Sequence, residues 1–213
     1  MLSMKSLKLY LLAAIALLVA ACSQKPAVHF AIDVDLTQME PAGVKIDSIV
    51  FSANHIVFQT IDKMPDYKAH VEGDVDAPCL GMMTVCYSLN GQQGSEAIPL
   101  VLEEGTITYN LEEGFAQGTP QNDAVHDFWT KMDPDGDINE YFQQFVEAHK
   151  GELCLASILS ENSISYYVDA KTIEDAVAAL SDEQKQSPEI KALTDKIEAG
   201  KKTAEGQMFD LYK

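Results

Sequence analysis

The chain has 213 residues and a formal net charge of −18 at pH 7. Such strong negative charge argues against nucleic acid and against anionic lipid surfaces as binding partners. The chain also has no arginine, so it lacks the side chain best suited to clamp a carboxylate or phosphate with two parallel hydrogen bonds. This acidity is typical of a solvated protein surface.

The N-terminus has the pattern of a lipoprotein signal peptide. Two lysines precede an apolar run from Leu9 to Ala21, which is too short for a transmembrane helix of about 20 apolar residues. The run ends in Ala20 and Ala21, directly before Cys22. We therefore predict that 1–21 is a cleaved signal peptide and that Cys22 carries the lipid groups of a stable membrane anchor. The alternative is an ordinary secretory signal in which Cys22 is incidental.

The residue after the predicted lipidation site bears on localisation. Ser23 resembles the residue at this position in outer-membrane lipoproteins, whereas inner-membrane lipoproteins favour Asp there. We therefore expect the chain in the cell envelope, lipid-anchored in the outer membrane and facing the periplasm. The mature part is long enough for one medium domain or two small ones.

The segment 22–118 is predicted to be an antiparallel β domain. Short runs of alternating apolar and polar residues are separated by Gly, Pro, Asn and Asp turns, and they predict strands at 28–36, 44–52, 55–61, 67–75, 79–88 and in two arms of 98–111. About seven such strands favour a β-sandwich or a partly open barrel. The Gly-rich stretch 90–95 has no lysine and opens no helix, so it is predicted to be a turn and not a phosphate-binding loop.

The stretch 98–111 predicts a β-hairpin. With Glu104-Gly105 as a two-residue loop, Gly105 would supply the positive φ of a type I′ turn. Three apolar pairs would then share one face of a single sheet, namely Leu102 with Ile107, Leu100 with Tyr109, and Ile98 with Leu111.

The segment 119–205 is predicted to be helical, which makes the fold class α+β. Apolar residues recur at helical spacing after Thr119, a good N-cap, and Pro120, a favoured first residue. Further helices are expected from Ile138 to His149, in the buried stretch 153–160, from Ile173 to Leu180 behind a Thr172 cap, and from Pro188 to Gly200. Ser181 and Gln184 are spaced as a capping box.

No catalytic, cofactor-binding or metal site is predicted. Asp133 to Glu140 invites a calcium interpretation, but both EF-hand registers lose required ligands. The stretch is therefore predicted to be a turn whose Asp137 caps the next helix. No two of the five histidines share a metal-ligand spacing such as i, i+4 on one helix.

The cysteines other than Cys22 are predicted to be small buried apolar residues. Cys79 and Cys86 are seven residues apart, which is not a C-x-x-C motif, and Cys154 is distant in sequence. If 79–88 is one strand, the first two side chains point to opposite faces about 23 Å apart, too far for a disulfide.

Four short motifs carry a resemblance to a known family. They are YKAHVEGDVDAP at 67–78, LEEGTITYNL at 102–111, GTPQND at 118–123 and EGQMFDL at 205–211. Together they resemble the N-terminal domain of unknown function that precedes the thioredoxin domain in many Gram-negative thiol–disulfide interchange lipoproteins. On this resemblance, 206–213 is the lead-in to a thioredoxin domain, and the chain stops at Lys213, where that domain and its C-x-x-C should begin.

The resemblance implies a non-catalytic, lipid-anchored envelope module that would hold a thioredoxin-like domain or protein near the membrane. Any disulfide oxidoreductase activity would need the thioredoxin domain. One alternative is a ligand- or protein-binding periplasmic lipoprotein that acts alone through the open face or edge of its β domain. The other is an enzyme, which would need a nucleophile constellation that the sequence does not display.

Overall fold

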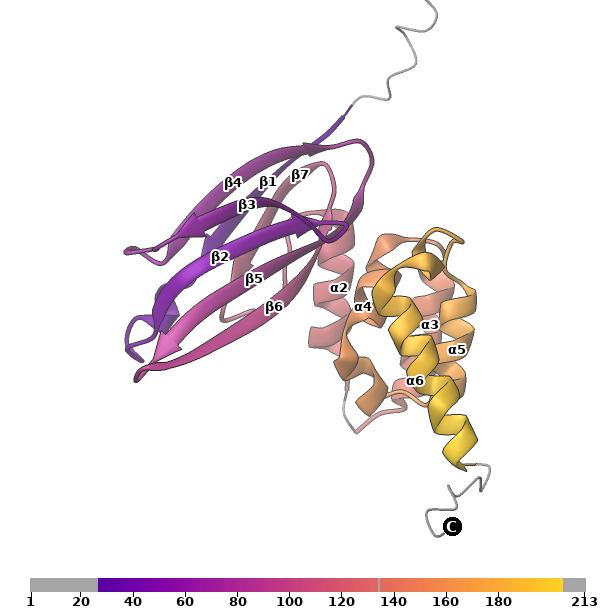
Figure 1. Ribbon diagram of the computed structural model, residues 1–213. Helices are drawn as coiled ribbons and strands as arrows, with labels where there is room; N and C mark the ends of the chain where they lie inside the picture. The colour runs from indigo at the N-terminus through magenta and orange to yellow at the C-terminus, as the bar shows by residue number, and fades with distance from the viewer. Residues whose placement is uncertain (1–26, 134, 205–213) are drawn as a thin grey trace, which may run out of the picture.

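The computed structural model describes residues 27–133 and 135–204. A β region stands beside a group of helices (Figure 1), which confirms the predicted α+β class with the sheets first and the helices after them. The predicted signal peptide, Cys22 and the lead-in at 206–213 lie outside the described residues.

The described residues form seven strands in two sheets. The strands are β1 (Val28–Asp35), β2 (Lys45–Ala53), β3 (Ile56–Asp62), β4 (Lys68–Val75), β5 (Cys79–Leu89), β6 (Gln92–Leu102) and β7 (Gly105–Asn110). One sheet has the order β4-β1-β7 and the other the order β3-β2-β5-β6, and they do not close into a barrel. All strand pairs are antiparallel except β1 and β7, which run parallel.

The core of the β region lies between the two sheets. Alternate residues of β1, β2 and β5 point inward, as the two-residue period predicts. On β1 these are Phe30, Ile32 and Val34, and they pack with Ile49 and Phe51 of β2 in one apolar cluster. The opposite residues of β1 face solvent, so the pattern of the sequence determines which face is buried.

The predicted hairpin at 98–111 is wrong. β6 pairs with β5, whereas β7 lies in the other sheet and pairs with β1, so the chain crosses between sheets at Glu103 and Glu104. The apolar residues of both arms still face the same core, because they approach it from opposite sheets. Alternating apolar and polar residues indicate which side of a strand is buried. A hairpin within one sheet and a connection between two sheets bury the same side, so the pattern does not distinguish them.

A hairpin does form one connection earlier. β5 and β6 are joined at Asn90 and Gly91, whose φ angles of 52° and 80° suit a type I′ turn. The turn predicted within 90–95 is confirmed, but it is two residues long and β6 begins at Gln92.

The described helices are α2 (Pro120–Lys131), α3 (Ile138–Ala148), α4 (Leu153–Ser160), α5 (Ala170–Ala178) and α6 (Pro188–Ala204), with the 3₁₀ turns η1 (Thr37–Met39), η2 (Asn162–Tyr166) and η3 (Gln184–Gln186). The buried helix predicted at 153–160 is confirmed as α4. It packs on α2 and α6 and also on β5 and β6. Phe128 of α2 packs against Tyr141, Phe142 and Phe145 of α3 at ring-centroid distances of 5.0–5.7 Å.

The predicted helix caps are confirmed in part. Asp137 caps α3 by accepting a hydrogen bond from the Glu140 amide at 3.0 Å. The Ser181–Gln184 capping box forms, although it opens only the short turn η3. The predicted Thr172 cap is wrong, because α5 begins three residues earlier and Asp169 accepts the hydrogen bond of the Thr172 amide at 2.8 Å. An aspartate carboxylate three residues before an amide caps a helix as well as threonine does.

The start of α2 joins the two halves of the molecule. The buried side chain of Asn122 accepts a hydrogen bond from the Val101 amide at 3.0 Å and donates one to the Val101 carbonyl at 2.7 Å. Gln121 accepts hydrogen bonds from the Leu153 and Cys154 amides at the start of α4. Thr119 occupies the predicted N-cap position, but its hydroxyl accepts from Asn122 and not from the helix backbone.

Candidate functional site

A groove of about 310 Å³ lies where the outer face of the four-stranded sheet meets the helices. Its apolar lining comes from Val50, Val57, Leu80, Met82 and Pro99, which lie on four adjacent strands. The outer face of a solvated sheet is ordinarily polar. Here part of it is apolar, and Leu80 also packs against the core of the helical region.

Polar groups line the rim of this groove. His55 belongs to the tight turn between β2 and β3 and lies 3.3 Å from the carboxylate of Glu189, in the first turn of α6. The hydroxyl groups of Ser160 and Ser187 lie on the helical side, opposite Ser52 and Thr84 of the sheet. The groove therefore combines an apolar floor with hydrogen-bonding groups at its edge, a combination found in binding sites for small ligands and peptides.

The edge strand β3 borders the groove. β2 is its hydrogen-bonded neighbour in the sheet, and its other edge faces outward. Three consecutive apolar side chains are exposed, Ile56 by 73%, Val57 by 57% and Phe58 by 37%. The ring of Phe58 lies 5.7 Å from that of Phe30, so it also closes the side of the sandwich.

The other three sheet edges carry cover or charge along part of their length in the described part of the chain. Gln117 forms two backbone hydrogen bonds with Thr108 of β7, and Asn122 occupies the backbone groups of Val101 on β6. The edge strand β4 carries alternating charged and histidine side chains, namely Lys68, His70, Glu72 and Asp74. Proteins guard sheet edges by such cover or charge, and β3 has neither along its first three residues, which are apolar and exposed.

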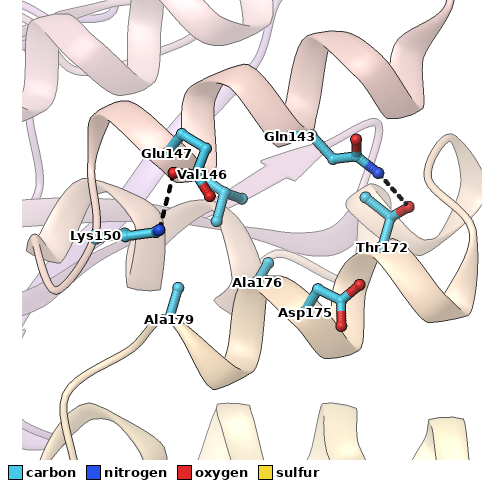
Figure 2. Close-up of a pocket in the computed structure, with 8 residues that line it drawn as sticks. All are labelled: Gln143, Val146, Glu147, Lys150, Thr172, Asp175, Ala176 and Ala179. Atoms are coloured by element: carbon cyan, nitrogen blue, oxygen red, sulfur yellow. Dashed lines mark hydrogen bonds and ion pairs between the residues drawn. The ribbon is translucent and has the colours of Figure 1, made fainter.

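A second groove lies between α3 and α5 (Figure 2). Its floor is formed by Val146, Ala176 and Ala179. Among the polar side chains drawn there, Lys150 pairs with Glu147 at 2.8 Å and Gln143 donates a hydrogen bond to Thr172 at 3.4 Å. Its apolar lining is one valine and two alanines, whereas five larger apolar side chains line the groove on the sheet, so this groove is the weaker candidate for binding a ligand.

Each of the five histidines lies beside a carboxylate. The pairs are His29 with Asp74, His55 with Glu189, His70 with Asp33, His126 with Glu113 and His149 with Glu152, at 2.6–3.3 Å. Hydrogen bonds to Asp33 and Glu72 raise the pKa of His70. Hydrogen bonds from Thr37 and Lys68 lower the pKa of nearby Asp35 to about 2. The outer face of the three-stranded sheet is thus a ladder of charge pairs across β1 and β4.

The structure brings together three residues that the sequence analysis did not combine. His149, Glu152 and Cys154 each offer a metal-ligand atom, and these atoms lie within 4.8 Å of one another. They span the turn from α3 to α4. The corresponding sequence pattern is H-x-x-E-x-C, which places three residues that can bind a metal close together. A search for pairs of histidines does not detect this pattern.

The predicted strand through Cys79 and Cys86 is confirmed as β5, and both thiols are free, as is that of Cys154. Burial raises the pKa of the Cys79 thiol, and burial together with Glu152 raises that of Cys154 to about 12. Thiols with raised pKa values carry little of the thiolate that acts as nucleophile.

The fold and the groove define an α+β protein with an open sandwich, an apolar edge strand and a helical flank. No family model, curated protein or solved structure matches the chain. Within 27–133 and 135–204, no helix has the length and apolar character needed to span a membrane.

Proposed function

We propose that the chain is a non-catalytic, lipid-anchored module of the cell envelope that binds another protein along β3 and in the adjoining groove. The observation that supports this proposal most directly is that the edge of β3 is exposed and apolar, unlike the other three sheet edges. The edges of β6 and β7 are each covered at one residue and that of β4 is charged, whereas β3 presents Ile56, Val57 and Phe58 to solvent. An extended segment of a partner can add to such an edge through backbone hydrogen bonds, with alternate side chains filling neighbouring pockets.

Backbone hydrogen bonds between β3 and an added strand do not depend on the partner's sequence, so the groove would select the partner through its side chains. Val57 lies both on the exposed edge and in the groove lining, so a strand added beside β3 would project alternate side chains toward the apolar floor. The hydroxyl groups and the His55–Glu189 pair at the rim offer hydrogen bonds to polar parts of the same segment.

The sequence resemblance supports a thioredoxin-like domain or protein as the partner. The lipoprotein pattern ending in Cys22 supports a site of action at the outer membrane, facing the periplasm. The alternative partner is a separate ligand or protein, bound by the chain acting alone. The mixed apolar and hydroxyl lining of the groove favours that alternative for small ligands.

A photo-crosslinking amino acid at position 57 of the anchored chain tests the proposal in intact cells. We expect one crosslinked protein, identified by mass spectrometry, and at least a tenfold loss of that product when Ile56 is changed to Lys. The matched control is a crosslinker at Leu89, an exposed apolar residue in the distant β5–β6 hairpin. A product with a C-x-x-C protein supports the thioredoxin-like partner, and a product with any other single protein supports the alternative. Equal crosslinking from positions 57 and 89, or none from either, would overturn the proposal.

A further inference from the structure

We propose that His149, Glu152 and Cys154 form a binding site for a borderline-soft divalent cation of the zinc class. The three side chains offer an imidazole nitrogen, a carboxylate oxygen and a sulfur, all within 4.8 Å of one another. Zinc is bound in proteins by these three ligand types. The site is separate from the β3 edge and does not depend on the proposed function.

Two of the three distances between ligand atoms lie close to those around a tetrahedral ion, and the third, between His149 and Cys154, is within 4.8 Å. Metal–ligand bonds of about 2.0–2.3 Å place neighbouring ligand atoms about 3.3–3.6 Å apart. Cys154 Sγ lies 3.6 Å from Glu152 Oε2, which matches. His149 Nδ1 lies 2.8 Å from the same oxygen and must move apart by about half an ångström to admit the ion. The Glu152 side chain is half exposed and is free to make that movement.

The backbone holds the donors in place. His149 is the C-cap of α3, and its ring packs on Phe145 with a centroid distance of 4.3 Å. Gly151, with a φ of +75°, reverses the chain, and Cys154 follows in the first turn of α4. Gln121 Oε1 accepts hydrogen bonds from the Leu153 and Cys154 amides, which fixes the start of that helix. The sulfur is therefore buried and positioned, while the partly exposed His149 and Glu152 leave a path for an ion.

The ligand set selects the class of ion. A thiolate disfavours the hard cations Mg²⁺ and Ca²⁺, which take oxygen ligands. Three protein ligands leave a fourth tetrahedral position for water or for a group from a partner.

Binding of the ion has a defined proton balance. A cysteine thiol has an ordinary pKa of about 8.5 and binds a metal as the thiolate, so the Cys154 thiol releases one proton as the sulfur–metal bond forms. The imidazole would bind the ion through the Nδ1 lone pair with its N–H on Nε2, so the hydrogen bond that joins Nδ1 to Glu152 in the ion-free chain is replaced by bonds to the ion. The thiol therefore accounts for the release of one proton for each ion bound.

The test uses the tag-free chain from residue 22 onward with Cys22→Ser, kept reduced and titrated with Zn²⁺ or Co²⁺. We expect one ion per chain, one proton released per ion in calorimetry with buffers of different ionisation heat, and a thiolate-to-Co²⁺ charge-transfer band. Cys154→Ser should abolish the band, and His149→Gln should weaken binding at least ~100-fold, since even outer-shell changes cost 10–100-fold.

The control variants carry similar changes away from the site. Cys79→Ser removes another partly buried thiol, and His126→Gln removes a histidine that is paired with Glu113 at 3.1 Å and does not belong to the group of His149, Glu152 and Cys154. Both should bind Zn²⁺ as the parent chain does. Glu152→Gln changes an exposed side chain, so it reports on binding even if Cys154→Ser fails to fold. A Co²⁺ complex without the thiolate band, or Zn²⁺ binding that is unchanged in Glu152→Gln and His149→Gln, would overturn the proposal.

Discussion

Glu161 accepts a hydrogen bond from the indole nitrogen of Trp129 at 3.3 Å, at the junction between β6 and the helices. Burial raises the pKa of this carboxyl group to about 7, although the hydrogen bonds from Trp129 and Ser163 act in the opposite direction. The indole of Trp129 in turn stacks on Phe115, with ring centroids 5.9 Å apart. A titrating group therefore lies where the two halves of the molecule meet.

This relationship predicts that stability falls as the pH rises through the range from about 4.5 to about 7. In that range the unfolded chain has lost the Glu161 proton while the folded chain still holds it, so the folded state binds more protons and rising pH favours unfolding. Glu161→Gln removes the titration and should make the chain more stable than the parent at pH 8, by about 3 kcal/mol at most. At pH 4 the two chains should be nearly equal.

Urea unfolding at several pH values measures this difference. Asp35→Asn is a control of opposite sign, because the pKa of Asp35 is lowered to about 2 and its contribution is lost only as the pH falls below about 4. A difference between Glu161→Gln and the parent that does not change between pH 4 and pH 8 would contradict the prediction.

Asn122→Ala is expected to destabilise the chain by roughly 2–4 kcal/mol, since it leaves both the amide and the carbonyl of Val101 without their buried partner. Chemical denaturation measures the change. The matched control is Asn110→Ala, which removes a single hydrogen bond to the Glu113 amide near the surface and should cost about 1 kcal/mol or less. Equal losses from the two variants would refute a special role for Asn122.

Cys79 and Cys86 are expected to remain unpaired even in an oxidising compartment. Both lie on β5, seven residues apart, so their side chains point to opposite faces of the sheet. Alkylation under denaturing, non-reducing conditions followed by mass spectrometry should label both thiols. A crosslinked Cys79–Cys86 peptide from native material would show that β5 is not continuous.

Cys22→Ser is expected to release the chain from the membrane into the soluble fraction, because the lipid attached at Cys22 is the predicted anchor. Fractionation of cells that express either form measures the distribution. A mutant that stays in the membrane pellet would place the anchor elsewhere.

The purified chain is expected to show no insulin-reductase turnover. Thioredoxin-type chemistry needs two cysteines two residues apart and a stabilised thiolate, and burial instead raises the thiol pKa of Cys79 and Cys154. Turnover that disappears in Cys79→Ala or Cys86→Ala would disprove this expectation.

Local elements could be predicted from the sequence to within a few residues. The strands from Val28 to Leu89, the buried helix α4 and the Asp137 cap all follow from period and capping chemistry, which act between residues close in the chain. The Thr172 cap was misplaced because Asp169 competes for the same amide. When two neighbouring residues are both good helix caps, capping chemistry alone does not show which of them begins the helix.

The sequence by itself determined which face of strands such as β1 is buried, where most helices and strands lie, and that the N-terminus has a lipoprotein pattern. Only the tertiary structure decided that β7 joins β1 instead of β6, that β3 is left as the uncovered apolar edge, and that His149, Glu152 and Cys154 converge. The physical reason is that alternation reports burial, a property of each residue in its own strand. The backbone groups at a sheet edge form hydrogen bonds with a segment that is distant in sequence. Which segment pairs with that edge depends on how the whole chain packs.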